Sequence, residues 1–213
     1  MATYDLDEQE QLDALKAWWK RWGSVAMLAL AVVVAAAAGW RYWQTRTLTQ
    51  NLEAAAVYQK LTQSLAGNDA KGAREAGAML IDQYKDTAYA PRAALLLAKL
   101  NAIGKDLKST QTQLEWAAAH SKEPAVKDLA RLRLAGVQLD QKQYDAALKT
   151  LDGAHSDAFA FRFHDLKGDV LLAQGKQADA RAAYQTAFGK MSEDNPYRSI
   201  VELKLDALGG QAK

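Results

Sequence analysis

The longest run of apolar residues lies near the N-terminus, and it contains no charged residue between Trp22 and Trp40. A helix over this run would be about 28 Å long, close to the thickness of the hydrocarbon core of a bilayer. A buried helix of a soluble domain would normally keep one polar face, which this run lacks. The pattern therefore predicts a membrane-spanning helix over residues 22–43.

Tryptophans flank this run on both sides. Five of the 6 tryptophans of the chain lie there, at Trp18, Trp19, Trp22, Trp40 and Trp43. Indole rings favour the level of the lipid headgroups, so two aromatic belts indicate a retained anchor. Two alternatives stay open. They are a soluble helix and a cleaved signal peptide with its site in Ala35–Gly39, although a long acidic segment precedes the run.

After Trp43 the apolar residues recur at spacings of three and four, and the chain has only 3 prolines. This spacing predicts helices of about 12 to 18 residues that are paired by short turns. The predicted breaks are Gly67–Asp69, Lys85–Thr87, Gly104–Asp106, Lys122–Pro124, Gln141–Gln143, His155–Asp157, Gly175–Lys176 and Glu193–Pro196.

A repeat of small and large residues runs through these helices. Its clearest copy has Gly168, Ala180, Tyr184 and Ala187, where small residues would let two helices cross closely. The earlier copies, at offsets of 33 and a further 37 residues, are Ala135, Ala147, Leu151 and Ala154, then Ala98, Thr110, Leu114 and Ala117. The pattern resembles the tetratricopeptide repeat, while a generic alanine-rich helical bundle is the alternative.

The predicted fold is all-α. It comprises a tail over 1–21, a single transmembrane helix over 22–43 and a tetratricopeptide-like solenoid of helical hairpins over 44–213. The hairpin from Leu48 to Tyr84 matches the repeat poorly, and a last helix from Tyr197 to Leu208 would cap the stack.

Residues that could carry out chemistry are scarce. The chain has no cysteine, and its three histidines are not spaced as a helical pair of metal ligands. His164 and Asp165 are adjacent, and neighbouring helical residues point about 100° apart, so Asp165 is poorly placed to orient His164. Positive and negative charges are interspersed, with a net charge of +2, which does not favour nucleic-acid binding. We therefore predict a binding module without a cofactor or metal rather than an enzyme.

Two sets of residues are candidates for binding. In the tetratricopeptide family the first helix of each hairpin lines a groove. The matching residues here are Arg92, Leu95, Lys99, Leu129, Leu132, Leu139, Arg162, Asp165, Asp169 and Leu172. Their mixture suits extended polypeptide, although each leucine could instead belong to the core between helices. In the anchor, Ala31, Ala35 and Gly39 share one helix face and could pack against another helix, unless they only reflect the general use of alanine.

Three segments carry a more specific resemblance: EQEQLDALKAWWKRWG, GWRYW and LRLAGVQLDQKQYDAALKTLD. Together they resemble the ancillary subunit of the bacterial Sec translocon, a family of inner-membrane tetratricopeptide proteins. The resemblance implies a cytoplasmic N-terminus and a periplasmic domain near the exit of the translocon. It also implies a membrane-anchored, prolyl-isomerase-like chaperone as partner, with emerging polypeptides as clients. The acidic tail would reach a stress-response regulator in the cytoplasm.

Two other classes of function remain open from the sequence. One is a structural scaffold of another envelope complex that handles no clients. The other is a membrane-tethered hydrolase with its site hidden among the helices.

Overall fold

The computed structural model describes residues 4–209, and its side chains from residue 10 onward. All regular structure in this part of the chain is helical. The helices are α1 (Tyr4–Ala66), α2 (Ala70–Gln83), α3 (Tyr89–Ile103), α4 (Leu107–His120), α5 (Pro124–Asp140), α6 (Tyr144–Leu151), α7 (Asp157–Ala173), α8 (Gln177–Gly189) and α9 (Arg198–Ala207). The chain divides into two units, Met1–Gln50 and Asn51–Lys213.

The first unit is the N-terminal part of α1, and its apolar side chains are exposed. Leu28 is 67% exposed, and Val33 and Trp40 are exposed to a similar extent. Soluble proteins rarely leave so large an apolar surface uncovered. Within the described residues, α1 is the one helix long and apolar enough to cross a membrane, and it fits the predicted anchor.

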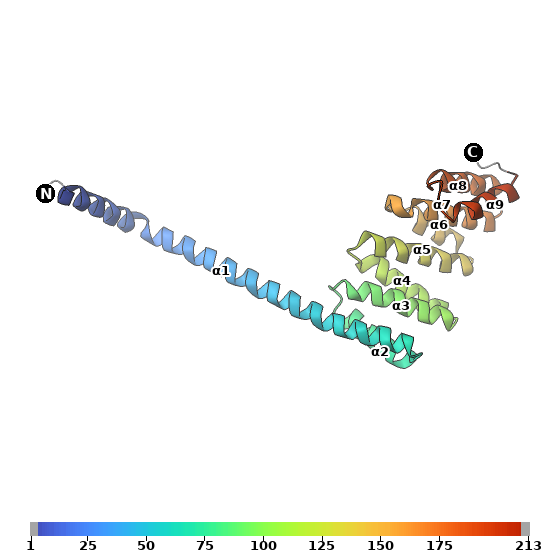
Figure 1. The fold of residues 1–213 in the computed structure, drawn as a ribbon, viewed down its shortest axis with the longest axis horizontal. Coiled ribbons are helices and arrows are strands. Elements are labelled where there is room, and N and C mark those ends of the chain that lie inside the picture. Colours follow the sequence, from blue (N-terminus) through green and yellow to red (C-terminus); the bar gives the residue numbers. More distant parts are fainter. Residues whose placement is uncertain (1–3, 210–213) are drawn as a thin grey trace. The chain divides into compact units, whose positions relative to one another are not determined.

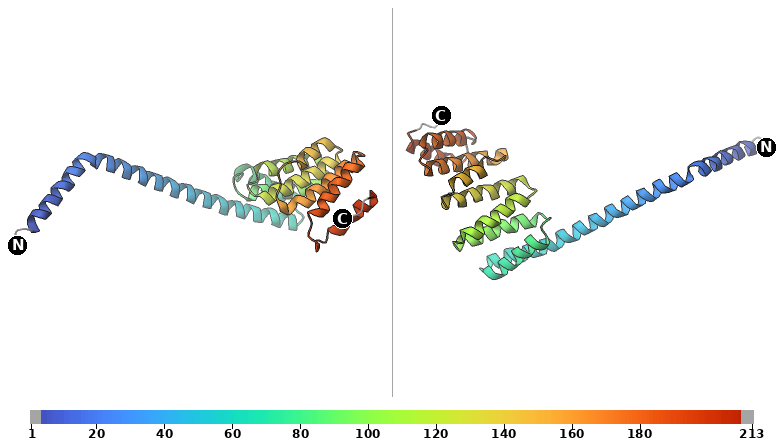
Figure 2. Two further views of the ribbon diagram at one scale, coloured as in Figure 1. Left: turned by 90° about the horizontal axis from the view of Figure 1, so that it is seen from above. Right: turned by 180° about the vertical axis from the view of Figure 1, so that it is seen from behind.

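The second unit is a stack of helical hairpins, as predicted (Figures 1 and 2). Its first hairpin joins the C-terminal part of α1 to α2, and the pairs α3–α4, α5–α6 and α7–α8 follow. The helix α9 packs on α8 at the end of the stack. Each predicted break separates two helices in the structure, because glycine, proline and polar residues at these points favour turns.

Each hairpin turns through one residue with positive φ. These residues are Asn68, Lys105, Lys142 and Gly175, with φ between 56° and 78°. In the second hairpin, Asp106 N–H donates to the carbonyl of Asn101 and closes the end of α3. This contact is the Schellman motif that commonly ends helices. Only the last of these four hairpins has glycine, the residue that adopts this conformation without strain, at the position with positive φ.

The small residues of the repeat lie where the helices of a hairpin cross. Ala98, Ala135 and Gly168 are buried on the first helices, opposite the buried Thr110, Ala147 and Ala180 on the second. The predicted register of the repeat is therefore confirmed in these three hairpins.

One predicted repeat position is wrong. Ala154 is exposed and lies in the loop after α6, which ends at Leu151. The loop is held from α5 instead: the Arg131 guanidinium donates to the carbonyls of Thr150 and Ala154, and Asp128 accepts from Ser156. Because these hydrogen bonds from α5 hold the segment as a loop rather than as a further helical turn, Ala154 does not lie at the helix crossing.

The first hairpin follows the same register with the sizes reversed. Leu61 occupies the position of Ala98, and Gly77 occupies the position of Leu114, 37 residues earlier in each case. Leu61 is fully buried, and a Cβ at Gly77 would come within 2.7 Å of the Leu97 side chain of α3. Large and small residues have exchanged places, which explains why this hairpin matched the repeat poorly in sequence.

The core is a series of clusters, each at a junction along the stack. They centre on Leu80 between the first two hairpins, Leu114 at the next junction, Phe163 at the third and Tyr184 below α9. This arrangement is typical of repeat proteins, in which each unit contacts only its neighbours.

Candidate functional site

The candidate binding surface lies on the first helices of the hairpins, and burial separates its predicted residues. Leu95 and Leu132 are 6% and 9% exposed and belong to the core, so the expectation that they line a groove is wrong for these two. Leu129 and Leu139 are half-buried and pack against core clusters. The periodicity of the sequence placed all four leucines on the correct helices, but neighbouring hairpins cover their side chains in whole or in part.

Four of the remaining candidates on α3 and α7 reach solvent. Lys99, Arg162 and Leu172 are exposed. Arg92 is half-exposed, and its guanidinium lies 2.7 Å from the Glu123 carboxylate. Arg162 lies over the rings of Phe161 and Tyr197, 5.5 Å from each centroid. Arg162 and Lys99 are therefore the charged candidates that a ligand could reach most directly.

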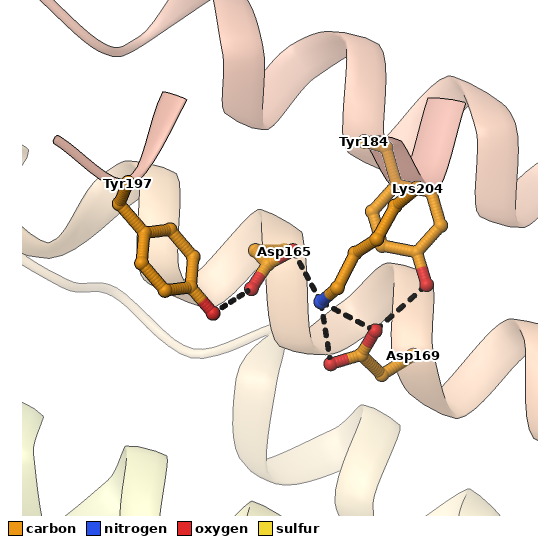
Figure 3. A network of polar contacts seen from close by, with 5 residues as sticks. All are labelled: Asp165, Asp169, Tyr184, Tyr197 and Lys204. Atoms are coloured by element: carbon orange, nitrogen blue, oxygen red, sulfur yellow. Dashed lines mark hydrogen bonds and ion pairs between the residues drawn. The ribbon is translucent and has the colours of Figure 1, made fainter. Parts of the chain in front are cut away.

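Asp165 and Asp169 are not free on this surface. Both carboxylates accept from the Lys204 ammonium of α9, with the closest oxygen of each 2.7 Å away (Figure 3). Asp169 also accepts from the Tyr184 hydroxyl, and Asp165 accepts from the Tyr197 hydroxyl. Asp165 is 5% exposed. We therefore correct the expectation of an open surface here: the two aspartates bind the capping segment.

Charge and burial shift the pKa values in this network. Burial raises the pKa of the Asp165 carboxyl, and the Lys204 ammonium offsets part of that effect. Burial alone would lower the pKa of Lys204, but its hydrogen bonds to Asp165 and Asp169 outweigh burial and raise it. Burial and the hydrogen bond to Asp169 raise the pKa of Tyr184. The two carboxylates thus share one cation that holds its proton more tightly than a free lysine.

His164 is not oriented by Asp165. The oxygens of Asp165 accept from Tyr197 and Lys204. The ring of His164 lies 6.0 Å from that of His155, and burial lowers the pKa of His164. Among the described residues there is no group of three or more side chains that could hold a metal ion.

Two cavities adjoin α3, one between it and the C-terminal part of α1 and the other between it, α4 and α5. The larger, of about 480 Å³, is lined by Thr62, Leu65, Ala66, Asn68, Ala70, Leu96, Lys99, Leu100 and Ile103. The second, of about 330 Å³, is lined by Ala98, Lys99, Ala102, Thr110, Leu114 and Arg133. Both volumes fall in the range of about 300–1,000 Å³ that is common for ligand sites. Lys99 lines both cavities, so the two adjoin at this residue of α3.

Two groups of residues at this surface were not predicted from the sequence. Arg133 and Ile103 line the cavities, and each lies one helical turn from a predicted position, so extending the repeat face would have found them. Tyr184, Tyr197 and Lys204 complete the aspartate network. No repeat register could have found Tyr197 and Lys204, because they lie beyond the last hairpin.

In the anchor, Ala31, Ala35 and Gly39 lie on exposed positions of α1. A Cβ at Gly39 would meet no atom within 4 Å, so this face is open for a neighbouring helix. The acidic residues Asp5, Asp7 and Glu8 of the tail lie outside the described side chains, and so does their expected contact with a regulator.

Comparison with known proteins covers both units. The family model of the tetratricopeptide repeat-like domain matches residues 16–210. The ancillary SecYEG translocon subunit of Neisseria gonorrhoeae is 32% identical over 95% of this chain and 98% of its own length. The subunit of the same name from Escherichia coli is 31% identical over 98% of this chain and 99% of its own, and that of Haemophilus influenzae is 29% identical over 97% and 100%. This chain therefore belongs to the tetratricopeptide repeat-like family and, within it, to the family of ancillary SecYEG translocon subunits.

Proposed function

We propose that this protein is a non-enzymatic, membrane-anchored subunit that associates with the SecYEG translocon and helps to pass emerging polypeptides to periplasmic chaperones. The observation that carries the proposal is the similarity to ancillary SecYEG translocon subunits, which extends through the apolar helix as well as the hairpins. In this proposal the apolar helix holds the chain in the membrane, and the hairpins provide the surface that binds polypeptides.

The proposed topology has the N-terminal tail in the cytoplasm and the hairpins in the periplasm. Lys16, Lys20 and Arg21 precede the apolar run, whereas Arg41 and Arg46 follow it. The positive-inside rule therefore favours a cytoplasmic N-terminus by a small margin. In this orientation the hairpins would meet polypeptides as they leave the translocon. A membrane-anchored, prolyl-isomerase-like chaperone is the proposed periplasmic partner, and the acidic tail could contact a cytoplasmic stress-response regulator.

In-cell photocrosslinking tests this function. A photoreactive residue at Arg162 or Leu172, both exposed on α7, should capture subunits of SecYEG, a chaperone or exported chains, identified by mass spectrometry. The same residue at Lys149, exposed on the second helix α6, is the control. Capture of a different envelope complex without exported chains would instead indicate a scaffold.

Protease treatment of spheroplasts tests the topology. External protease should digest the hairpin unit while the N-terminal tail stays protected. Protection of the hairpins until the membrane is lysed would reverse the proposed orientation.

A further inference from the structure

The second and fourth hairpins carry opposite charges at the same position of the repeat. Lys99 on α3 and Asp169 on α7 occupy equivalent positions, because the successive offsets of the repeat are 37 and 33 residues. At the C-terminal end Asp169 meets a cation of the chain itself, Lys204 of α9. At Lys99 in the second hairpin the charge is inverted, and no carboxylate among the side chains that the structure describes forms an ion pair with it.

The charged residues that line the two cavities beside Lys99 are all positive. Lys99 and Arg133 line the same cavity, and they are its charged residues. The adjoining larger cavity has Lys99 as its one charged residue. In residues 10–209, whose side chains the structure describes, neither Lys99 nor Arg133 forms an ion pair. Two like charges thus share an apolar surface without a carboxylate between them.

The rest of the surface is apolar and accessible. Leu65, Leu96 and Leu100 are half-buried in the wall of the larger cavity, and Ile103 at its edge is 73% exposed. An apolar side chain that enters this cavity would leave water, which favours binding in proportion to the apolar area buried. The surface therefore offers apolar area that a ligand could bury, together with two positive charges that form no ion pair among the described side chains.

We propose that the cavities on either side of Lys99 bind an apolar polypeptide segment that carries a carboxylate, with the carboxylate placed between Lys99 and Arg133. This inference rests on the proposed function, because it names the chemical class of polypeptide that the hairpins would take. The network around Lys204 supports it within the same fold, since two carboxylates and an ammonium there join α7 to α9 at the equivalent position. Charge complementarity of this kind selects between partners more than it adds affinity.

Peptide binding by the full-length chain tests the proposal. The chain is placed in nanodiscs of an uncharged phospholipid, and empty nanodiscs serve as the blank. The probes are two fluorescein-labelled peptides of leucine, phenylalanine and serine, one with two glutamates and the other with two lysines at the same positions. We expect the glutamate peptide to bind the wild-type chain about tenfold more tightly than the lysine peptide, by fluorescence polarisation.

Variants locate the site. Lys99→Glu combined with Arg133→Glu should invert the preference, so that the lysine peptide binds more tightly. Lys149→Glu, an exposed lysine on α6, is the matched charge control and should leave the preference unchanged. Ile103→Asp should weaken both peptides, whereas Leu203→Asp, 70% exposed on α9, should not.

Three outcomes would overturn the proposal: equal binding of both peptides to the wild type, an unchanged preference after the double charge reversal, or the same inversion with Lys149→Glu. Circular dichroism melting checks that each variant is folded, and Lys99→Gln with Arg133→Gln, which should abolish the preference, replaces any reversal that unfolds. Co-purification of SecYEG with the wild-type chain is measured in parallel. Its absence would refute the proposed function, whereas the peptide preference alone decides this inference.

Discussion

Gly168 of α7 lies so close to Tyr184 of α8 that a Cβ at position 168 would stand 2.4 Å from Cε1 of the ring. Tyr184 is fully buried, and its hydroxyl donates to Asp169, the residue that follows Gly168 on α7. Protein atoms therefore shield the ring from solvent. This contact joins the repeat to the aspartate network: the absence of a side chain at one residue lets the ring reach the carboxylate at another.

Gly168→Ala should destabilise the hairpin unit because the added methyl group forces the ring and its hydrogen bond to shift. We expect a loss of about 1–3 kcal/mol in the free energy of unfolding. Urea denaturation of the full-length chain in mild detergent measures it. Gly136→Ala is the matched control, since a Cβ on this helical glycine meets no atom within 4 Å. That change should stabilise by about 0.5–1 kcal/mol, and equal effects of the two would contradict the close contact.

The turn residues allow a stabilising change. Lys142 has a φ of 60°, which costs a residue with a side chain about 1–2 kcal/mol relative to glycine. Glycine adds entropy to the unfolded chain, so Lys142→Gly should gain about 0.5 kcal/mol net. The reverse change, Gly175→Ala at a φ of 78°, should lose about 1 kcal/mol. Thermal melting of both variants checks the pair, and the prediction fails if their melting temperatures move in the same direction.

Removal of Lys204 should loosen the capping helix. Lys204→Met leaves Asp165 and Asp169 facing each other without a cation. The Lys204 side chain is 25% exposed, so water screens part of the effect, and we expect a cost of about 1–3 kcal/mol. Hydrogen exchange should rise first in α9. Lys71→Met, which removes an exposed pair with Glu75, is the control and should change stability by less than about 1 kcal/mol. Unchanged protection of α9 in Lys204→Met would show that apolar contacts alone hold the cap.

The same network predicts sensitivity to alkaline pH. The pKa of Lys204 is raised from its ordinary 10.5, and the pKa of Tyr184 is raised from its ordinary 10.0. In each case the folded chain keeps a proton that the unfolded chain releases, so the contribution is complete below the ordinary pKa and is lost as pH rises above it. Stability should therefore fall from about pH 10 upward, as measured by urea denaturation across the alkaline range. Tyr184→Phe with Lys204→Met should flatten this dependence, and an equally steep fall in the double variant would place its origin elsewhere.

The anchor gives a prediction about association. Leucine at Ala35 and Gly39 should block close approach of another helix on that face, so less SecYEG should co-purify after mild detergent extraction. Insertion into the membrane should not change, since leucine is more apolar than either residue. Ala36→Leu with Ala37→Leu is the matched control away from this face. Equal recovery of SecYEG with both double variants would mean that the face of Ala31, Ala35 and Gly39 makes no special contact.

Two residues that were predicted to line a binding groove are buried in the structure. Leu95 and Leu132 were placed on the correct helices, but adjacent hairpins bury them. Periodicity specifies which residues share a helix face, and it does not specify how far a neighbouring hairpin covers that face. Lys99 and Arg162, with long charged side chains, stay at the surface and remain predictions for binding.

The sequence by itself determined the apolar helix, the positions of the helix breaks and the register of three hairpins, because these depend on local spacing, turn residues and the sizes of residues at helix crossings. Only the tertiary structure decided that the first hairpin keeps the register with Leu61 and Gly77 exchanged in size. It also decided that Asp165 and Asp169 meet Lys204, a residue 35 or more positions away on a helix outside the repeat. Contacts of this kind depend on how α9 packs against the last hairpin, and no periodic pattern along the chain encodes that placement.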